Sequence, residues 1–143
     1  MQTLDREHKA SVTRLKWSKA WSKRHVAHEM MLASADASGR IIIWNVKSGE
    51  VKTQLLSDSK MIQAMEWLGE AIEDTGHLLL VIHAPNILVL WDALSGKKIW
   101  TKTFPETLLS FDLDPFDISR LALKATDCIL FINDFHTSKV PNR

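Results

Sequence analysis

MMLASADASGRIIIWNVKSGEVKTQL, residues 30–55, and HLLLVIHAPNILVLWDALSGKKIWTKTF, residues 77–104, follow the same pattern of residues. Trp44 and Trp91 lie 47 positions apart, and the Ser-Gly pairs that follow them are separated by the same 47 positions. A weaker third copy, ISRLALKATDCILFINDF, occupies residues 118–135. Repetition with a period of about 20 to 50 residues indicates a fold assembled from similar structural units.

Each copy has the features of short β-strands joined by tight turns. Residues 41–44 and 87–91 are apolar runs rich in β-branched residues, as expected for strands buried on both faces. Asp-Ala-Ser-Gly at 36–39 predicts a hairpin turn between the flanking strands, and Pro-Asn at 85–86 predicts its counterpart. Apolar residues alternate along 51–55, which indicates an outer strand with one face in water.

A further strand precedes each copy, at residues 12–17, 62–67 and 108–113. Four antiparallel strands per repeat, with the third ending in Trp-Asp, are typical of the WD-repeat β-propeller. The third strands here end in Trp44-Asn45 and Trp91-Asp92. We therefore expect an all-β chain that forms part of a WD-repeat propeller, with about three four-stranded antiparallel blades.

The repeats divide the chain into blades. We assign residues 2–6 to the outer strand of a preceding blade, 8–56 and 59–104 to two blades, 107–135 to a degenerate blade, and 136–143 to a tail. A closed propeller contains about four to eight blades, so we expect a row that does not close and is a fragment of a larger propeller.

Composition excludes several classes of protein. The chain has 143 residues, 45% of them apolar and 24% charged, which is typical of a soluble globular protein. Eighteen basic residues against 17 acidic residues leave no overall field to attract nucleic acid or an anionic membrane. The single cysteine, Cys128, excludes an internal disulfide. The charged N-terminus lacks the apolar region of a signal peptide, so we expect a cytoplasmic protein.

Four polar or aromatic side chains form the best-defined constellation: His8, Ser34, Asp36 and Trp44. In WD repeats, which these positions resemble, the corresponding residues form a hydrogen-bonded chain that stabilises the blade. Ser, His and Asp also suggest a nucleophilic triad, but a triad needs an exposed nucleophile and an oxyanion site. We therefore favour the structural role and expect no enzyme.

The second copy departs from this constellation. It retains Trp91, but it has Asn86 near the position of the Asp and no clear equivalent of His8. We expect its hydrogen-bond network to be weaker or different.

A metal site and a cofactor site are both disfavoured. His25, His28 and Glu29 could bind zinc, but their order matches neither H-E-x-x-H nor H-x-x-E-H. The five glycines have neither common spacing of a phosphate-binding loop. We expect no metal, no nucleotide and no other cofactor.

A basic segment supports an alternative function, the binding of anionic lipid or nucleic acid. Basic residues and two tryptophans alternate in it: Arg14, Lys16, Trp17, Lys19, Trp21, Lys23 and Arg24. We favour the simpler interpretation, in which Trp17 belongs to the core and the basic side chains form a solvated face.

Protein partners would be expected to contact the turns and the outer strand. The candidate partner-binding residues are Lys9, Ser38, Arg40, Asn86 and Trp100. For Trp100, packing at the rim and exposure as an anchor for a partner are both open.

The chain resembles the first propeller of a family of large WD-repeat scaffolds with two propellers. Three segments carry the resemblance, in this order: LASADASGRIIIWNV, LLLVIHAPNILVLWDALSGKKIW and SFDLDPFD. The resemblance spans about Gln2 to Lys139, and Ile82 to Asn86 and Asp114 to Asp117 are not general WD-repeat features. The rest of that propeller, the second propeller and a helical C-terminal region have no counterpart here.

The resemblance implies a non-enzymatic scaffold for protein–protein interactions. It implies a place in a complex that captures endosome-derived vesicles at the trans-Golgi network, with links to ciliogenesis and Hedgehog signalling. The expected partners are subunits of that complex and transcription factors, with no small-molecule substrate and only indirect membrane association. The expected locations are the cytoplasm, the trans-Golgi network, vesicles, the base of the cilium and the nucleus.

Overall fold

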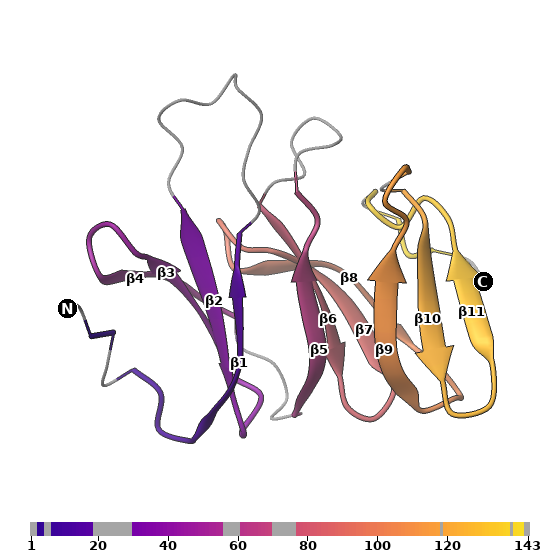
Figure 1. The fold of residues 1–143 in the computed structure, drawn as a ribbon, viewed down its shortest axis with the longest axis horizontal. Coiled ribbons are helices and arrows are strands. Elements are labelled where there is room, and N and C mark those ends of the chain that lie inside the picture. Colours follow the sequence, from indigo (N-terminus) through magenta and orange to yellow (C-terminus); the bar gives the residue numbers. More distant parts are fainter. Residues whose placement is uncertain are drawn as a thin grey trace.

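The computed structural model describes residues 3–4, 7–18, 30–55, 61–69, 77–117, 119–137 and 139–141. Three antiparallel sheets, here called blades 1, 2 and 3, stand in a row (Figure 1). Blade 1 contains β1 (Val12–Trp17), β2 (Met31–Asp36), β3 (Ile41–Asn45) and β4 (Glu50–Leu55). Blade 2 contains β5 (Ile62–Trp67), β6 (Leu78–His83), β7 (Ile87–Asp92) and β8 (Lys97–Thr103). Blade 3 contains β9 (Leu108–Leu113), β10 (Leu121–Ala125) and β11 (Ile129–Ile132).

This architecture confirms the predicted all-β fold and the open row of blades. In blades 1 and 2 the spatial order of the strands is their order in the sequence, and every neighbouring pair is antiparallel. The described part of the chain contains no helix, and hence none long and apolar enough to cross a membrane.

The repeat extends to irregularities of the backbone. The register between third and fourth strands shifts between Ile43 and Trp44 in blade 1, and between Leu90 and Trp91 in blade 2. The first strand pair of each blade also contains a register shift near its start. The shift between the third and fourth strands therefore lies directly beside the tryptophan of the third strand in both blades.

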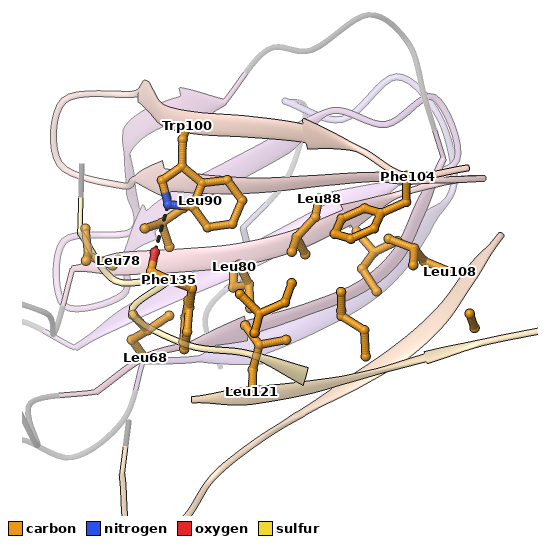
Figure 2. Close-up of a cluster of buried hydrophobic side chains, with 14 residues drawn as sticks. Leu68, Leu78, Leu80, Leu88, Leu90, Trp100, Phe104, Leu108, Leu121 and Phe135 are labelled. Carbon is orange, nitrogen blue, oxygen red and sulfur yellow. Dashed lines mark hydrogen bonds between the residues drawn. The ribbon is translucent and has the colours of Figure 1, made fainter. Parts of the chain in front are cut away.

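Blade 2 is buried on both faces. Side chains of a strand alternate between its faces, so Leu79 and Val81 of β6 pack towards blade 1, whereas Leu78, Leu80 and Ile82 pack towards blade 3. This two-sided burial explains why β6 is a continuous apolar run. Figure 2 shows the cluster between blades 2 and 3.

The first strands of the three blades, β1, β5 and β9, lie in a row (Figure 1). Hydrogen bonds connect each of them to the next blade. The indole Nε1 of Trp67 donates to the backbone oxygen of Lys16 at 3.0 Å. The amide Nε2 of Gln63 donates to the backbone oxygen of Leu109 at 3.3 Å. Side chains of one blade thus bind the backbone of its neighbour.

Blade 3 ends differently from the other two. Its sheet contains three strands in the described residues, and the chain beyond β11 returns to blade 2. Phe135 is fully buried there, and its backbone oxygen accepts a hydrogen bond from the indole of Trp100 at 2.8 Å (Figure 2). Lys102 Nζ donates to the backbone oxygen of Pro141 at 2.7 Å. The segment that follows β11 therefore covers the outer side of the apolar cluster between blades 2 and 3.

The predicted outer strand at residues 2–6 lies largely outside the described part of the chain. Thr3 and Leu4 have no strand structure, and the remaining residues of this segment lie outside the described part of the chain.

Candidate functional site

The side chain of His8 links the loop before β1 to the hairpin of β2 and β3. Its Nδ1 lies 2.7 Å from Asp36 Oδ2, and its Nε2 lies 2.6 Å from Ser34 Oγ. The indole Nε1 of Trp44 donates to the same Ser34 Oγ at 2.8 Å. A carboxylate only accepts and an indole only donates, so His8 Nδ1 donates to Asp36 and the Ser34 hydroxyl donates to His8 Nε2. The four predicted residues thus form one continuous chain.

Asp36 organises the turn that follows it. Its Oδ1 accepts hydrogen bonds from the backbone N–H and hydroxyl of Ser38, at 2.9 and 2.6 Å, and from the backbone N–H of Arg40 at 3.2 Å. Burial raises the pKa of Asp36, but the hydrogen bonds from Ser38, His8 and Arg40 together outweigh burial. The pKa is therefore lowered, and the carboxylate form is stabilised.

This arrangement does not resemble a catalytic triad. Ser34 is buried, and its hydroxyl oxygen already accepts the Trp44 N–H. A nucleophile has to be reachable by a substrate, and the hydroxyl of Ser34 is not. The geometry therefore supports a role in holding the hairpin.

In blade 2 a histidine accepts the hydrogen bond that the tryptophan of the third strand donates. Trp91 Nε1 lies 3.3 Å from the Nε2 of the buried His83, which accepts its hydrogen bond. His83 follows Asp36 by 47 positions, the same offset that separates Trp44 from Trp91. The network differs from that of blade 1, as expected, but His83 was not predicted as its member, although the repeat offset points to it.

The turns at one end of the strands lie on the same side of the molecule, which we call the loop face. It comprises residues 7–11, 36–40, 84–86, 104–107 and 125–128, at the lower end of the blades in Figure 1. Backbone hydrogen bonds join the loops to one another: Ala37 N–H donates to Ser11 O at 2.9 Å, and Leu108 N–H donates to Pro85 O at 2.8 Å. These bonds give a surface of loops a fixed shape.

Three predicted partner-binding residues lie on the loop face of blade 1. Lys9 and Ser38 are exposed. Arg40 is half-buried, because its guanidinium donates to the backbone oxygen of Glu7 at 2.6 Å and to the side chain of Gln54. Lys9 and Ser38 are therefore open to a partner, whereas Arg40 ties the loop before β1 to β4.

The other two predicted partner-binding residues are used inside the molecule. Asn86 Nδ2 donates to the backbone oxygen of Phe104 at 2.7 Å, and the backbone N–H of Phe104 donates to Asn86 O at 2.9 Å. Trp100 is only 3% exposed, in the cluster between blades 2 and 3 (Figure 2). The prediction of Trp100 as a partner-binding residue was wrong, because the segment around Phe135 covers its ring.

The described part of the basic segment lies on β1. Arg14 and Lys16 are exposed, but Arg14 Nη2 donates to the backbone oxygen of Gln63 at 3.4 Å, and Lys16 Nζ lies 3.4 Å from Glu66 Oε2. Trp17 is 55% exposed, so its assignment to the core was wrong. No described blade covers that side of β1.

The remaining candidate residues of this region lie outside the described part of the chain. They are Lys19, Trp21, Lys23 and Arg24 of the basic segment, and His25, His28 and Glu29 of the weighed metal site. Where the structure is described, no group of three His, Cys, Asp or Glu side chains is placed to hold a metal ion.

Sequence comparison identifies the relationship of these blades. The profile of the family described as the WDR11 first beta-propeller matches residues 7–135, from the loop that carries His8 to the buried Phe135. The chain belongs to the WDR11 first β-propeller family. The resemblance to the first propeller of this family is thereby confirmed.

Curated relatives of this family are substantially longer than the chain. WD repeat-containing protein 11 of Danio rerio is 44% identical over 143 residues, which cover 99% of this chain and 11% of the relative. The Homo sapiens protein of the same name is 40% identical over 144 residues, with coverages of 99% and 12%. The chain thus spans about one ninth of the relatives that it matches.

Solved structures share the fold of these blades. The β-propeller domain of Cps50 (Swd1) from Myceliophteria thermophila superposes with a TM-score of 0.67 at 20% identity, over 94% of this chain and 38% of that chain. A chain in the crystal structure of the Mitotic Checkpoint Complex also has a TM-score of 0.67, at 16% identity and the same coverages. Both similarities establish a propeller fold for this family member.

Proposed function

We propose that the chain is a non-catalytic scaffold that binds other proteins through the loop face. The loop face combines exposed side chains with loops whose backbones are joined by hydrogen bonds, and this rigidity carries the proposal. A preorganised surface loses little conformational entropy when a partner binds. The sequence alone suggests a catalytic role for three polar side chains, His8, Ser34 and Asp36. In the structure they are hydrogen-bonded to one another and to Trp44, and they stabilise blade 1.

Family membership supports a more specific role in membrane traffic. We infer that the chain contributes to a complex that captures endosome-derived vesicles at the trans-Golgi network, with further links to ciliogenesis and Hedgehog signalling. Its partners on this view are subunits of that complex and transcription factors. Its sites of action are the cytoplasm, vesicles, the base of the cilium and the nucleus.

Proximity labelling in cells tests both levels of this proposal. The chain is fused to a biotin ligase and compared with a loop-face variant, Lys9→Glu with Ala37→Arg, which alters two exposed side chains and keeps the bonds of Asp36. The matched control is Phe116→Arg, at a 98% exposed position in the turn at the opposite end of the strands.

We expect the labelling of trafficking proteins to decrease in the loop-face variant and to persist in the control. Unchanged labelling in the loop-face variant, or an equal loss in the control, would overturn the loop face as the binding surface. A labelled set without Golgi or endosomal proteins would overturn the assignment to traffic.

The alternative of a charged ligand gives a different result. A chain that binds anionic vesicles or an oligonucleotide through Arg14 and Lys16 would lose affinity steeply as salt rises. Direct binding assays at two salt concentrations, with Arg14→Glu as the variant, separate this alternative from a protein-binding scaffold. Both side chains already have partners on β5, which disfavours the alternative.

A further inference from the structure

One backbone hydrogen bond recurs at the loop-face end of all three blades. Its donor directly follows the second strand of the blade, and its acceptor directly precedes the first strand. The three bonds are Ala37 N–H to Ser11 O at 2.9 Å, Ala84 N–H to Met61 O at 2.7 Å, and Thr126 N–H to Thr107 O at 3.2 Å. The bond therefore identifies equivalent positions on this side of the three blades.

Blade 2 differs from its neighbours in the residue that accepts this bond and in the residue that follows the donor. In blade 2 these residues are Met61 and Pro85, and both are exposed. Blades 1 and 3 have exposed polar residues at the same positions: Ser11 and Ser38 in blade 1, Thr107 and Asp127 in blade 3. Among the three described blades, the loop-face end is thus apolar at these positions in the middle blade.

A third apolar residue, Pro105, is exposed beside the turn that carries Pro85. It directly follows Phe104, whose N–H donates to the backbone oxygen of Asn86 at 2.9 Å. The side chain of Asn86 returns a hydrogen bond to the backbone oxygen of Phe104 at 2.7 Å. We call Met61, Pro85 and Pro105 the apolar centre, and these bonds hold its backbone in place.

Opposite charges lie on the two sides of the apolar centre. Lys9 is exposed on blade 1, and Asp127 is exposed on blade 3, with blade 2 between them. An anionic membrane would favour a surface of positive charge throughout, and the carboxylate of Asp127 opposes such binding. An apolar middle with a polar and charged rim is instead the arrangement of protein–protein interfaces.

The residue types of the apolar centre suit it to binding. Proline has almost no side-chain rotamer freedom to lose when a partner covers it, so burial of Pro85 and Pro105 has little entropic cost. Methionine is unbranched and polarisable, and it adapts its shape to the side chain that it meets. Met61 is 50% exposed, so a large part of its surface is open to a partner.

We infer that the apolar centre binds an apolar side chain of a partner protein, flanked by an acidic residue on the side of Lys9 and a basic residue on the side of Asp127. This inference rests on the proposed function, because it gives the chemistry of the partner that the loop face binds. Burial of the apolar side chain supplies most of the affinity. The flanking charges fix the direction in which the partner lies across the blades.

A phage-displayed library of random peptides, selected on the immobilised wild-type chain, provides the probe. We expect the selected peptides to share a central apolar residue, with acidic residues on one side of it and basic residues on the other. One selected peptide is then synthesised with a fluorescent label. Its affinity for the chain and for each variant is measured by fluorescence polarisation.

Met61→Glu tests the apolar centre. Its affinity for the peptide should fall by about tenfold or more, as expected when the anchor position of an interface is damaged. Leu94→Glu is the matched control, because Leu94 is 49% exposed in the turn between β7 and β8, at the opposite end of the same blade. The affinity of this control should equal that of the wild-type chain.

A charge reversal tests the direction of binding. The double variant Lys9→Glu with Asp127→Lys exchanges the charges on the two sides of the apolar centre. It should bind the original peptide more weakly than the wild-type chain does. A second peptide, in which the acidic and basic residues are exchanged, should show the opposite preference.

Several results would overturn the inference. They are selected peptides that lack an apolar residue or carry charges of one sign, a selection without a peptide that depends on Met61, and an equal loss of affinity in Leu94→Glu. Binding of the chain to vesicles of phosphatidylcholine and phosphatidylserine that is lost in Met61→Glu would assign the apolar centre to a membrane instead. If Met61→Glu is unfolded by circular dichroism, Pro105→Glu replaces it with the same expected results.

Failure of this inference can be distinguished from failure of the proposed function. Met61→Glu is added to the proximity-labelling experiment, beside the loop-face variant Lys9→Glu with Ala37→Arg. Labelling that persists in Met61→Glu but is lost in the loop-face variant would overturn the apolar centre and leave the loop face as the binding surface. Labelling that persists in both variants would overturn the loop face itself.

Discussion

Trp44 is the residue at which packing and hydrogen bonding meet in blade 1. Its ring is buried, and its N–H binds the hydroxyl of Ser34, which in turn binds His8. Replacement of a large buried aromatic by alanine costs about 3 to 5 kcal/mol, a considerable part of the roughly 5 to 15 kcal/mol by which a domain is stable. We expect Trp44→Ala to lower the melting temperature sharply, as measured by circular dichroism.

The matched control for this change is Trp44→Phe, which retains an aromatic ring and removes the donor. It should cost less than Trp44→Ala, with about 1 kcal/mol attributable to the lost hydrogen bond. A melting curve that is the same for wild type and Trp44→Ala would contradict the structural role of the network.

Asp36 makes the stability of blade 1 depend on pH. Its pKa is lowered in the folded state, because the hydrogen bonds from Ser38, His8 and Arg40 outweigh its burial. The unfolded chain then binds a proton more readily than the folded chain, so the stabilisation is present above the unfolded pKa, about 3.9. It is lost as the pH falls through the folded pKa.

We therefore expect the melting temperature of the wild-type chain to fall as the pH is lowered below about 4. Asp36→Asn should be less stable at neutral pH and should show a smaller fall, because its side chain does not titrate. Parallel acid-dependent losses in the two proteins would assign the effect to other carboxylates.

At the scale of the elements, the turn between β7 and β8 connects two blades. Asp92 Oδ1 accepts hydrogen bonds from the backbone N–H groups of Leu94 and Ser95, and Thr53 of blade 1 donates its hydroxyl to Leu94 O at 3.3 Å. Gly96 closes this turn with a φ of +76°, and a Cβ added there would lie 2.9 Å from Thr53 Cγ2. This turn needs glycine for its conformation and for the proximity of the neighbouring blade.

We expect Gly96→Ala to destabilise the chain. A non-glycine residue in the left-handed region costs about 1 to 2 kcal/mol, and displacement of Thr53 adds to that cost. Gly49→Ala is the matched control, since Gly49 has a φ of +75° in the equivalent turn of blade 1, the blade that itself contains Thr53. Chemical denaturation should show a larger loss for Gly96→Ala than for Gly49→Ala, and the reverse order would contradict the packing argument.

At the scale of the whole molecule, burial rises towards the middle of the row. β6 and β7 are covered by blades on both faces and paired with strands on both edges. β11 has exposed Ile129 and Phe131 on one face and lies at the edge of its sheet. Local opening therefore requires the least free energy at β11 and the most at β6 and β7.

Amide hydrogen exchange by mass spectrometry should show this order, with β6 and β7 exchanging slowest and β11 fastest. Equal exchange rates in β7 and β11 would show instead that the three blades open as one unit.

Much of the secondary structure could be predicted from the sequence. The hairpin of β2 and β3 follows from the apolar runs and from Asp36 and Gly39 in the turn, because alternation and turn formation are local properties of a few residues. The hydrogen-bonded chain from His8 to Trp44 was expected from the resemblance of these positions to WD repeats, and it is present.

Only the tertiary structure decided which side chains are covered. Trp17 and Trp67 occupy equivalent positions on similar strands, yet one is exposed and the other is buried, because a blade lies on one and no described blade lies on the other. The sequence left open whether Trp100 binds a partner or packs inside the molecule. In the structure the segment at Phe135 covers its ring, so it packs inside the molecule. Local sequence determines which face of a strand is apolar, but burial depends on contacts between residues far apart in the chain.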